Sequence, residues 1–233
     1  MIIKYGGGVV DARGSVGGNT YSRNRFGAYI RSRVKGVDPK SARQNTARIR
    51  VMTLAEQWRE SPMDASKRGA WETYAASVSW LNKLGEAVNL TGYNHYMRSN
   101  AAIAAAGGTR VDDGPTDIGL PGGDDTIVVS GVGGSTTVSV AFDDELEWCA
   151  ELGGFLLVEL GQPQNPTRNF FGGPWRVAGA IAGAEIPITS PKTVTTPWTL
   201  TNGQKIWVRC KIIRKDGRVS TPFQPEPFTP TGL

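Results

Sequence analysis

Short runs of β-favouring residues, separated by glycines, occupy residues 6 to 36. This pattern predicts a β-hairpin or meander that turns near Phe26-Gly27. Because side chains of a strand alternate between two faces, the length of that turn decides where the charged residues lie. A loop with an odd number of residues would place Arg23 and Arg25 on the face of Arg31. A loop with an even number would place them on opposite faces, and the sequence leaves both possibilities open.

From Pro39 the apolar residues recur every three or four positions, which is the spacing of one face of a helix. Three such stripes predict three amphipathic helices that pack into a small bundle. Ser61-Pro62 marks the end of the first helix, and Thr91 is suited to cap the third. Gly107-Gly108 is expected to end the third helix. The stripes are Ala47, Val51, Leu54, Ala55 and Trp58, with Pro39 in the first turn; Trp71, Tyr74, Ala75, Val78 and Leu81, with Asp64 or Ser66 as the cap; and Tyr93, Tyr96, Met97, Asn100, Ala101 and Ala104.

The pattern changes again after residue 108. Residues 109–123 are rich in Gly, Pro and Asp and indicate a linker. Residues 124–233 contain β-favouring segments between turn residues, which predicts an antiparallel β-sandwich of about seven strands. The expected fold class is therefore α+β. A basic, glycine-rich β arm (1–38) precedes a three-helix bundle (39–108), the linker (109–123) and the sandwich (124–233).

The last segment of the predicted sandwich resembles the final two strands of fibronectin type III and related immunoglobulin-like domains. The matching stretches are Leu200 to Gly203, Ile206 to Ile212 and Gly217 to Pro222. The usual strand tyrosine falls at Ile206, which departs from the pattern and loses the hydroxyl contact. The alternation within this segment predicts one core face and one wet face, and Lys215-Asp216-Gly217 supplies a hairpin turn.

Charge is distributed unevenly along the chain. The formal net charge is +5, but residues 1 to 110 hold 17 Lys+Arg against 7 Asp+Glu, and residues 111 to 233 hold 9 against 14. No acidic residue occurs between Asp11 and Asp38. Arginine forks bind carboxylate or phosphate and stack on rings, so this strip predicts contact with another macromolecule. The expected contact residues are Arg23, Arg25, Tyr29, Arg31, Arg33 and Lys35.

No residue pattern points to catalysis, and we expect no enzyme activity, cofactor, metal or small-molecule substrate. His95 is the single histidine and is expected to be structural on the third helix. Asp143, Asp144, Glu145 and Glu147 lack the spacing of a calcium loop and predict a solvated turn. Cys149 and Cys210 lie in apolar runs, so buried thiols are expected, with a disulfide as the alternative.

The first 100 residues resemble uncharacterised proteins encoded in structural gene clusters of tailed bacteriophages. The likeness lies in the glycine-rich opening, Gly14 to Lys35, Asp38-Pro39, Gln44 to Trp58 and the L-T-G-Y-N-H-Y motif at Leu90 to Tyr96. It implies a virion component made in the host bacterial cytoplasm, with copies of itself and other virion proteins as partners. No apolar window long enough for a membrane span occurs, so no membrane partner is expected.

The expected function is a non-enzymatic virion structural protein that assembles in many copies through its basic arm, at the head-tail junction, neck or tail. The alternatives are a capsid decoration protein or an accessory protein that contacts the viral DNA backbone through the same arm. A third possibility is carbohydrate binding by aromatic residues of the sandwich, namely Trp175, Trp198 and Trp207.

Overall fold

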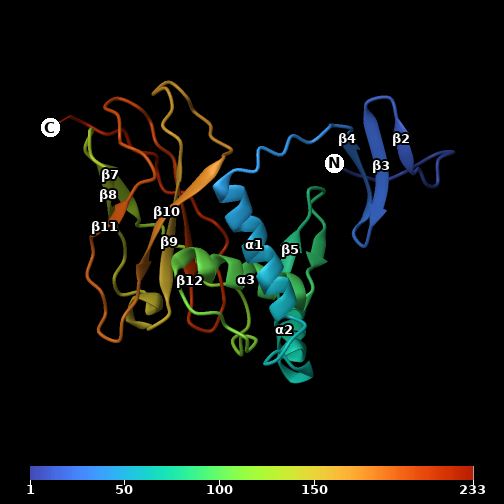
Figure 1. The fold of residues 1–233 in the computed structure, drawn as a ribbon, viewed down its shortest axis with the longest axis horizontal. Helices are drawn as coiled ribbons and strands as arrows, with labels where there is room; N and C mark the ends of the chain where they lie inside the picture. Colours follow the sequence, from blue (N-terminus) through green and yellow to red (C-terminus); the bar gives the residue numbers. More distant parts are fainter. Residues whose placement is uncertain (233) are drawn as a thin grey trace.

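The computed structural model describes residues 1–232 and shows a mixed α+β protein. In Figure 1 the N-terminal sheet lies at one end of the molecule, the C-terminal sheets at the other, and the helices between them. The helices are α1 (Ala42–Gln57), α2 (Ala65–Ser77) and α3 (Gly92–Ala106). The strands are β1 (Ile2–Ile3), β2 (Gly14–Val16), β3 (Asn19–Asn24), β4 (Gly27–Ser32), β5 (Ser79–Leu81), β6 (Ala87–Asn89), β7 (Val128–Gly131), β8 (Thr137–Ala141), β9 (Phe155–Gly161), β10 (Trp175–Ala182), β11 (Lys192–Thr195) and β12 (Val208–Ile213).

The arm (residues 1–38) folds into a four-stranded antiparallel sheet with the order β1-β4-β3-β2. Asn24 pairs with Gly27, so the β3–β4 hairpin turns through two residues, Arg25 and Phe26. The turn therefore lies where the sequence predicts it. Its even length settles the open question of faces, because Arg23 pairs with Ala28 and lies on the opposite face from Tyr29 and Arg31.

The three helices begin and end at capping residues. At the start of α1, Ser41 and Gln44 form a capping box, in which each side chain accepts a hydrogen bond from the other residue's backbone N–H. Asp64 accepts from the backbone N–H of Lys67 at 2.9 Å and caps α2. Thr91 caps α3, and Gly107 ends it with a φ of 81°, a conformation that favours glycine. Three helices in these places were expected. However, α1 begins after its cap Ser41, so Pro39 lies outside its first turn, and it ends at Gln57, before Ser61-Pro62.

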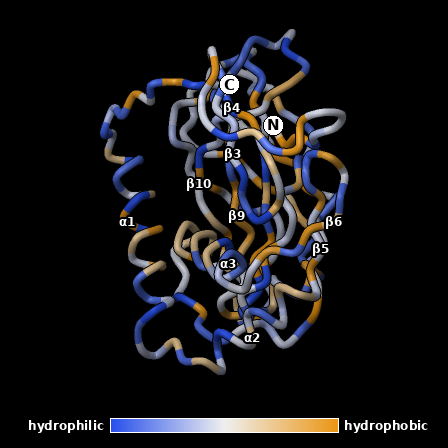
Figure 2. Tube along the Cα trace, turned by 90° about the vertical axis from the view of Figure 1, so that its right-hand side faces the viewer, coloured by the Kyte–Doolittle hydropathy of each residue, from blue (hydrophilic) through white to orange (hydrophobic). Residues whose placement is uncertain are grey.

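Three details of the predicted stripes are wrong. In α3, Ala104 is exposed, because the buried face of this helix carries Ala102 and Ile103 instead. In α1, Leu54 is buried, but Ala47 and Val51 are exposed, because the N-terminal part of the helix extends beyond the residues that could cover it. Leu81 belongs to no helix, since α2 ends at Ser77 and the chain then forms the β5–β6 hairpin. Figure 2 shows α1 at the edge of the molecule, with apolar and polar residues alternating along it.

The helices share an aromatic core. Trp71, Tyr74 and Tyr96 are buried and meet edge to face, with ring centroids 6.1 Å apart for Trp71–Tyr74 and 5.8 Å for Trp71–Tyr96. Trp58, at the end of α1, adds its ring 5.0 Å from that of Tyr96. This cluster fixes the C-terminal end of α1 against α3.

The C-terminal part contains two three-stranded antiparallel sheets, with the orders β11-β8-β7 and β10-β9-β12. Their inner faces form one hydrophobic core, which includes Val138, Val140, Val158 and Ile206. Six strands form in the described part of residues 124–232 instead of about seven. The segment after β12 turns at Lys215–Gly217 and joins β12 only through isolated bridges such as Cys210 to Phe223.

Helix α3 connects the helices to the β10-β9-β12 sheet. Ala102 and Ile103 pack against Leu157, Ile213 and Val219 in a third buried cluster. Residues 109–123 form no helix or strand, but hydrogen bonds hold them to the body. Trp71 donates from its indole N–H to the carbonyl oxygen of Asp112 at 2.9 Å.

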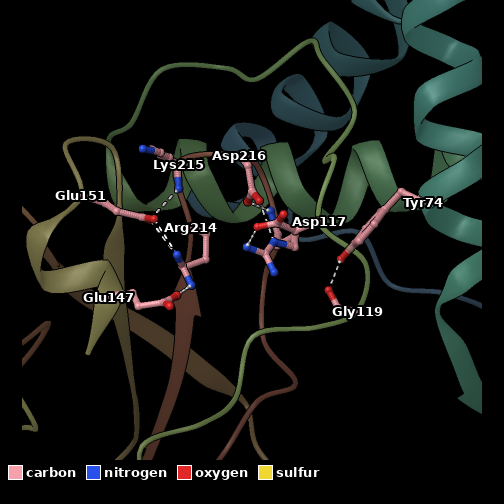
Figure 3. A network of polar contacts seen from close by, with 9 residues as sticks. Tyr74, Asp117, Gly119, Glu147, Glu151, Arg214, Lys215 and Asp216 are labelled. Carbon is pink, nitrogen blue, oxygen red and sulfur yellow. Dashed lines mark hydrogen bonds and ion pairs between the residues drawn. The ribbon is translucent and has the colours of Figure 1, made fainter. Parts of the chain in front are cut away.

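The same segment is held at its C-terminal end by the contacts in Figure 3. Tyr74 donates from its hydroxyl to the Gly119 carbonyl at 3.3 Å, and Arg218 pairs with Asp117 at 2.7 Å and with Asp216 at 2.6 Å. Nearby, Arg214 pairs with Glu151 and Glu147. The helices, residues 109–123 and the C-terminal sheets are thus joined by direct contacts.

Candidate interaction surface of the arm

The structure places the expected contact residues on the two central strands of the arm, in the turn between them and in the segment that follows. Arg23 lies on β3, Arg25 in the turn, and Tyr29 and Arg31 on β4; Arg33 and Lys35 follow β4. All five basic side chains are exposed, whereas Tyr29 is half-buried. Among residues 1–232, none of the five forms an ion pair. Their charge is therefore balanced by no carboxylate of the described residues.

Arg31 and Arg33 come together at one depression. Together with Thr20, Ser32 and Val34 they line a hollow of about 470 Å³. The backbone N–H of Arg33 donates to the Gly18 carbonyl at 2.7 Å, which holds this end of the strand in place. Two guanidinium groups beside a hollow can bind a carboxylate or phosphate through paired hydrogen bonds.

Arg25 is arranged differently. Its guanidinium lies over the ring of Phe26, 5.0 Å from the centroid, so the turn carries its own cation–π contact. Arg23 points from the other face of the sheet. The six predicted residues are thus divided between two faces and a turn, and only Arg31 and Arg33 share a hollow.

Tyr29 lies at the contact between the arm and the β5–β6 hairpin. An open groove of about 330 Å³ runs between these two parts. It is lined by Ile2, Asn24, Phe26 and Tyr29 from the arm and by Trp80, Leu81, Asn82, Val88 and Leu90 from the hairpin and its flanks. Lys4 and Glu86 form an ion pair across the same boundary. The hydrogen bond from Lys4 lowers the pKa of the Glu86 carboxyl below its usual value.

The exposed surface continues from the arm into α1. Leu54 is the first buried residue of the chain, so the preceding 53 residues form a sheet and most of a helix without one buried side chain. In α1, Ile49, Val51 and Met52 are 57%, 53% and 55% exposed. Apolar side chains that are exposed over several turns, beside basic ones, are typical of a surface that meets another molecule.

The other candidates from the sequence have structural roles in this fold. His95 is fully buried on α3, and its Nε2 accepts a hydrogen bond from the Trp80 indole N–H at 3.3 Å. Burial, followed by the charge of Arg98, lowers the pKa of His95 to about 4. Cys149 and Cys210 are buried free thiols, so the disulfide alternative is wrong. Burial raises the pKa of both thiols to about 12.

The acidic residues after β8 stabilise a turn. Asp143 accepts from the backbone N–H of Glu145 at 3.0 Å, and Asp144 accepts from that of Ser190 at 3.1 Å. Buried Asp124 accepts from the backbone N–H of Asp143 at 3.0 Å. In the described part of the chain, no three His, Cys, Asp or Glu side chains are arranged to hold a metal ion.

Of the three tryptophans considered for carbohydrate binding, Trp207 is buried and stacks on Phe171, with ring centroids 5.6 Å apart. Trp175 is half-buried and meets the same Phe171 ring at 5.1 Å. Trp198 is half-buried against the core of the C-terminal sheets. These rings serve mainly in packing, so they do not form an open stacking platform.

Comparison with known proteins gives no further guide. No protein-family model, curated protein or solved structure matches this chain. Across residues 1–232, no helix has both the length and the apolar character that a membrane span needs. The site must therefore be interpreted from its own geometry and charge.

Sequence reasoning missed the β5–β6 hairpin, which is the part of the body that the arm contacts. A signal for it was present in residues 79–89. Asn82 accepts from the backbone N–H groups of Leu84 and Glu86 at 2.8 and 3.0 Å, and Gly85 has a φ of 78°. An Asn and a Gly three residues apart between β-favouring residues are typical of a hairpin turn.

Proposed function

We propose that this chain is a non-enzymatic structural protein of a tailed-bacteriophage particle. It assembles in many copies through its basic arm and the exposed side of α1, and it belongs to the head-tail junction, neck or tail. The observation that carries the proposal is that the first 53 residues, which include four strands and most of α1, have no buried side chain. Ordering a backbone costs about 1–2 kcal/mol per residue, and burial of apolar surface is what normally offsets that cost. Within the described residues this segment gains only partial burial, which supports a partner outside the chain.

The placement in a phage particle is supported by the resemblance of residues 14–35 and 90–96 to proteins of tailed-phage structural gene clusters. The C-terminal sheets support a second part of this proposal, a fibronectin type III or immunoglobulin-like sandwich. Counting from β7, the first, second and fifth strands form one sheet, and the third, fourth and sixth form the other. This is the division of strands expected in such sandwiches.

Charge identifies the kind of surface that the arm meets. Arg31 and Arg33 share a hollow without an ion-pair partner in the described chain, whereas residues 111–233 carry more acidic than basic side chains. The acidic C-terminal part of a neighbouring copy fits this hollow electrostatically. A capsid decoration protein would use the same contacts at a different place in the particle.

The test measures the mass of the assembly in solution. We expect the protein to form oligomers at low salt that weaken at 1 M salt, where the screening length falls to about 3 Å. Changing Arg31 and Arg33 together to Glu reverses the charge of the hollow and is expected to give folded monomers. The matched control changes exposed Arg176 and Lys215 to Glu and leaves assembly intact. A protein that is monomeric at every concentration and salt refutes the proposal.

Contact with viral DNA is a second candidate, because the same two guanidinium groups suit a phosphate. Each neutralised phosphate contributes about −0.9 to the slope of log affinity against log salt. An electrophoretic shift at low salt that disappears steeply with salt, and that the Arg31/Arg33 double variant lacks, supports it. No shift at low salt excludes it.

A further inference from the structure

The arm is attached to the rest of its own chain by very few contacts. Of the hydrogen bonds and ion pairs in residues 1–232, the pair between Lys4 and Glu86 is the one that joins residues 1–33 to the chain after residue 37. Both side chains are largely exposed, and exposed ion pairs contribute little to stability. The remaining attachment is the apolar contact with the β5–β6 hairpin.

That apolar contact contains an open groove. The groove of about 330 Å³ lies between Phe26 and Tyr29 on the arm and Trp80 and Val88 on the hairpin. Side chains of a protein interior are close-packed, and atoms that face an open groove lack part of those contacts. The arm is therefore held to the hairpin by less packing than a core residue receives.

A four-residue hinge joins the arm to α1. Val34 to Val37 form no hydrogen bond with any residue that the structure describes, and Val34 and Val37 are 81% and 89% exposed. On the far side, Asp38 accepts from the backbone N–H of Lys40 at 3.1 Å and pairs with Arg48 at 2.8 Å, so the start of α1 is fixed. Four extended residues span about 13 Å. Rotation within this short segment can move the whole arm and leave the rest of the chain unchanged.

We propose that the arm is exchanged between copies, so that residues 1–33 of one chain occupy the β5–β6 hairpin of a neighbour. This rests on the assembly proposed above and names the site that receives the arm. Every contact that the arm makes with its own hairpin is available in the same form on a second copy, so exchange loses none of them. Exchange also brings two bodies together, and Ile49 and Met52 of α1 are exposed apolar residues that are available for the second body to cover. The closed chain offers no such gain, and this difference favours the exchanged form.

The experiment places one cysteine on each side of the contact, in different chains. A Lys4→Cys chain and a Glu86→Cys chain of different tag length are co-expressed at full length, and a short thiol cross-linker is added to the assembled fraction. Exchange brings these thiols to millimolar effective concentration, so cross-linked heterodimer is expected at least about tenfold above the control pair. The control combines Lys4→Cys with Glu60→Cys, an exposed residue after α1. The native cysteines are buried and do not compete.

A double variant, Lys4→Cys with Glu86→Cys in one chain, separates the outcomes. Oligomers in which this variant links between chains support exchange. Oligomers in which it links only within a chain, while the mixed pair stays at the control level, overturn exchange and leave the assembly proposal standing. Monomers that link only within the chain overturn both, and the measured mass distinguishes this result from the previous one.

Discussion

Arg98 is the side chain that most directly ties the helices to the C-terminal sheets. From α3 its guanidinium donates to the Val219 carbonyl at 2.7 Å and also to the Ser220 carbonyl, and it lies over the Trp80 ring at 4.9 Å from the centroid. Burial lowers the pKa of Arg98 below its usual value, yet arginine remains charged at any pH of interest. Replacing Arg98 with Met retains the apolar stem of the side chain and removes both hydrogen bonds and the cation.

The loss can be estimated from these contacts. Hydrogen bonds to a charged group contribute about 1.5–3 kcal/mol each, and a cation–π contact about 0.5–2 kcal/mol. The two carbonyls regain part of this from water because the site is only partly buried, so the expected loss is about 3–5 kcal/mol. For a chain of 150–250 residues this lowers the unfolding temperature by roughly 6–20 °C.

Thermal unfolding followed by circular dichroism tests this estimate. We expect one transition for the helices and the C-terminal sheets together, because α3 shares a buried cluster with β9 and β12. Arg43→Met is the control, because Arg43 is exposed on α1, and its transition is expected within about 1 °C of the parent. If Arg98→Met unfolds like the control, the helices and sheets are not coupled through this side chain and the reasoning fails.

Three further predictions follow from buried groups. Burial lowers the pKa of His95 to about 4, so as the pH falls the unfolded chain binds a proton near pH 6.5, before the folded chain does. The free energy of unfolding is therefore expected to fall by up to about 3 kcal/mol as the pH is lowered from 6.5 to 4. Urea unfolding of a His95→Gln variant is expected to lack this pH dependence. A Gly114→Ala change would place a Cβ 2.6 Å from backbone atoms of Ala70 and Trp71, and we expect it to lower the free energy of unfolding by about 1–3 kcal/mol. At Gly69 a Cβ would meet no atom within 4 Å, so Gly69→Ala is expected to stabilise α2. Both cysteines are expected to react with a thiol reagent only at the rate of unfolding, and rapid reaction of either in the native state would contradict their burial.

The sequence was sufficient to predict the start of α2, both ends of α3 and the hairpin of the arm. Asp64, Thr91 and Gly107 act through hydrogen bonds or backbone conformations that depend on near neighbours in the chain, so local pattern reveals them. The turn at Arg25–Phe26 lies within one residue of its predicted place for the same reason. The number of residues in that turn, and with it the division of charge between two faces, required the structure.

Two features depended on packing between distant residues and were not predicted correctly. The stripe on α1 was periodic, but periodicity does not say which part of it another element covers, and only its C-terminal end meets α3. The β5–β6 hairpin has strands of three residues, too short for an alternating pattern to stand out from the neighbouring helices. The sequence therefore does not reveal the contact site of the arm on the β5–β6 hairpin, although it does indicate Tyr29, one of the residues at that site, as a contact residue.

The distribution of ion pairs distinguishes the arm from an ordinary solvated surface. In the C-terminal part, Arg209, Arg214 and Arg218 are each paired with a carboxylate of the same chain, at 2.6 Å for Arg209–Glu159. A surface selected only for solubility carries both signs of charge interspersed. The arm has no acid between Asp11 and Asp38 and leaves Arg31 and Arg33 beside an open hollow. The chain thus pairs these arginines with its own carboxylates, whereas none of the five basic residues from Arg23 to Lys35 has such a partner in residues 1–232. This unpaired charge supports the proposal that the arm meets a partner outside the chain.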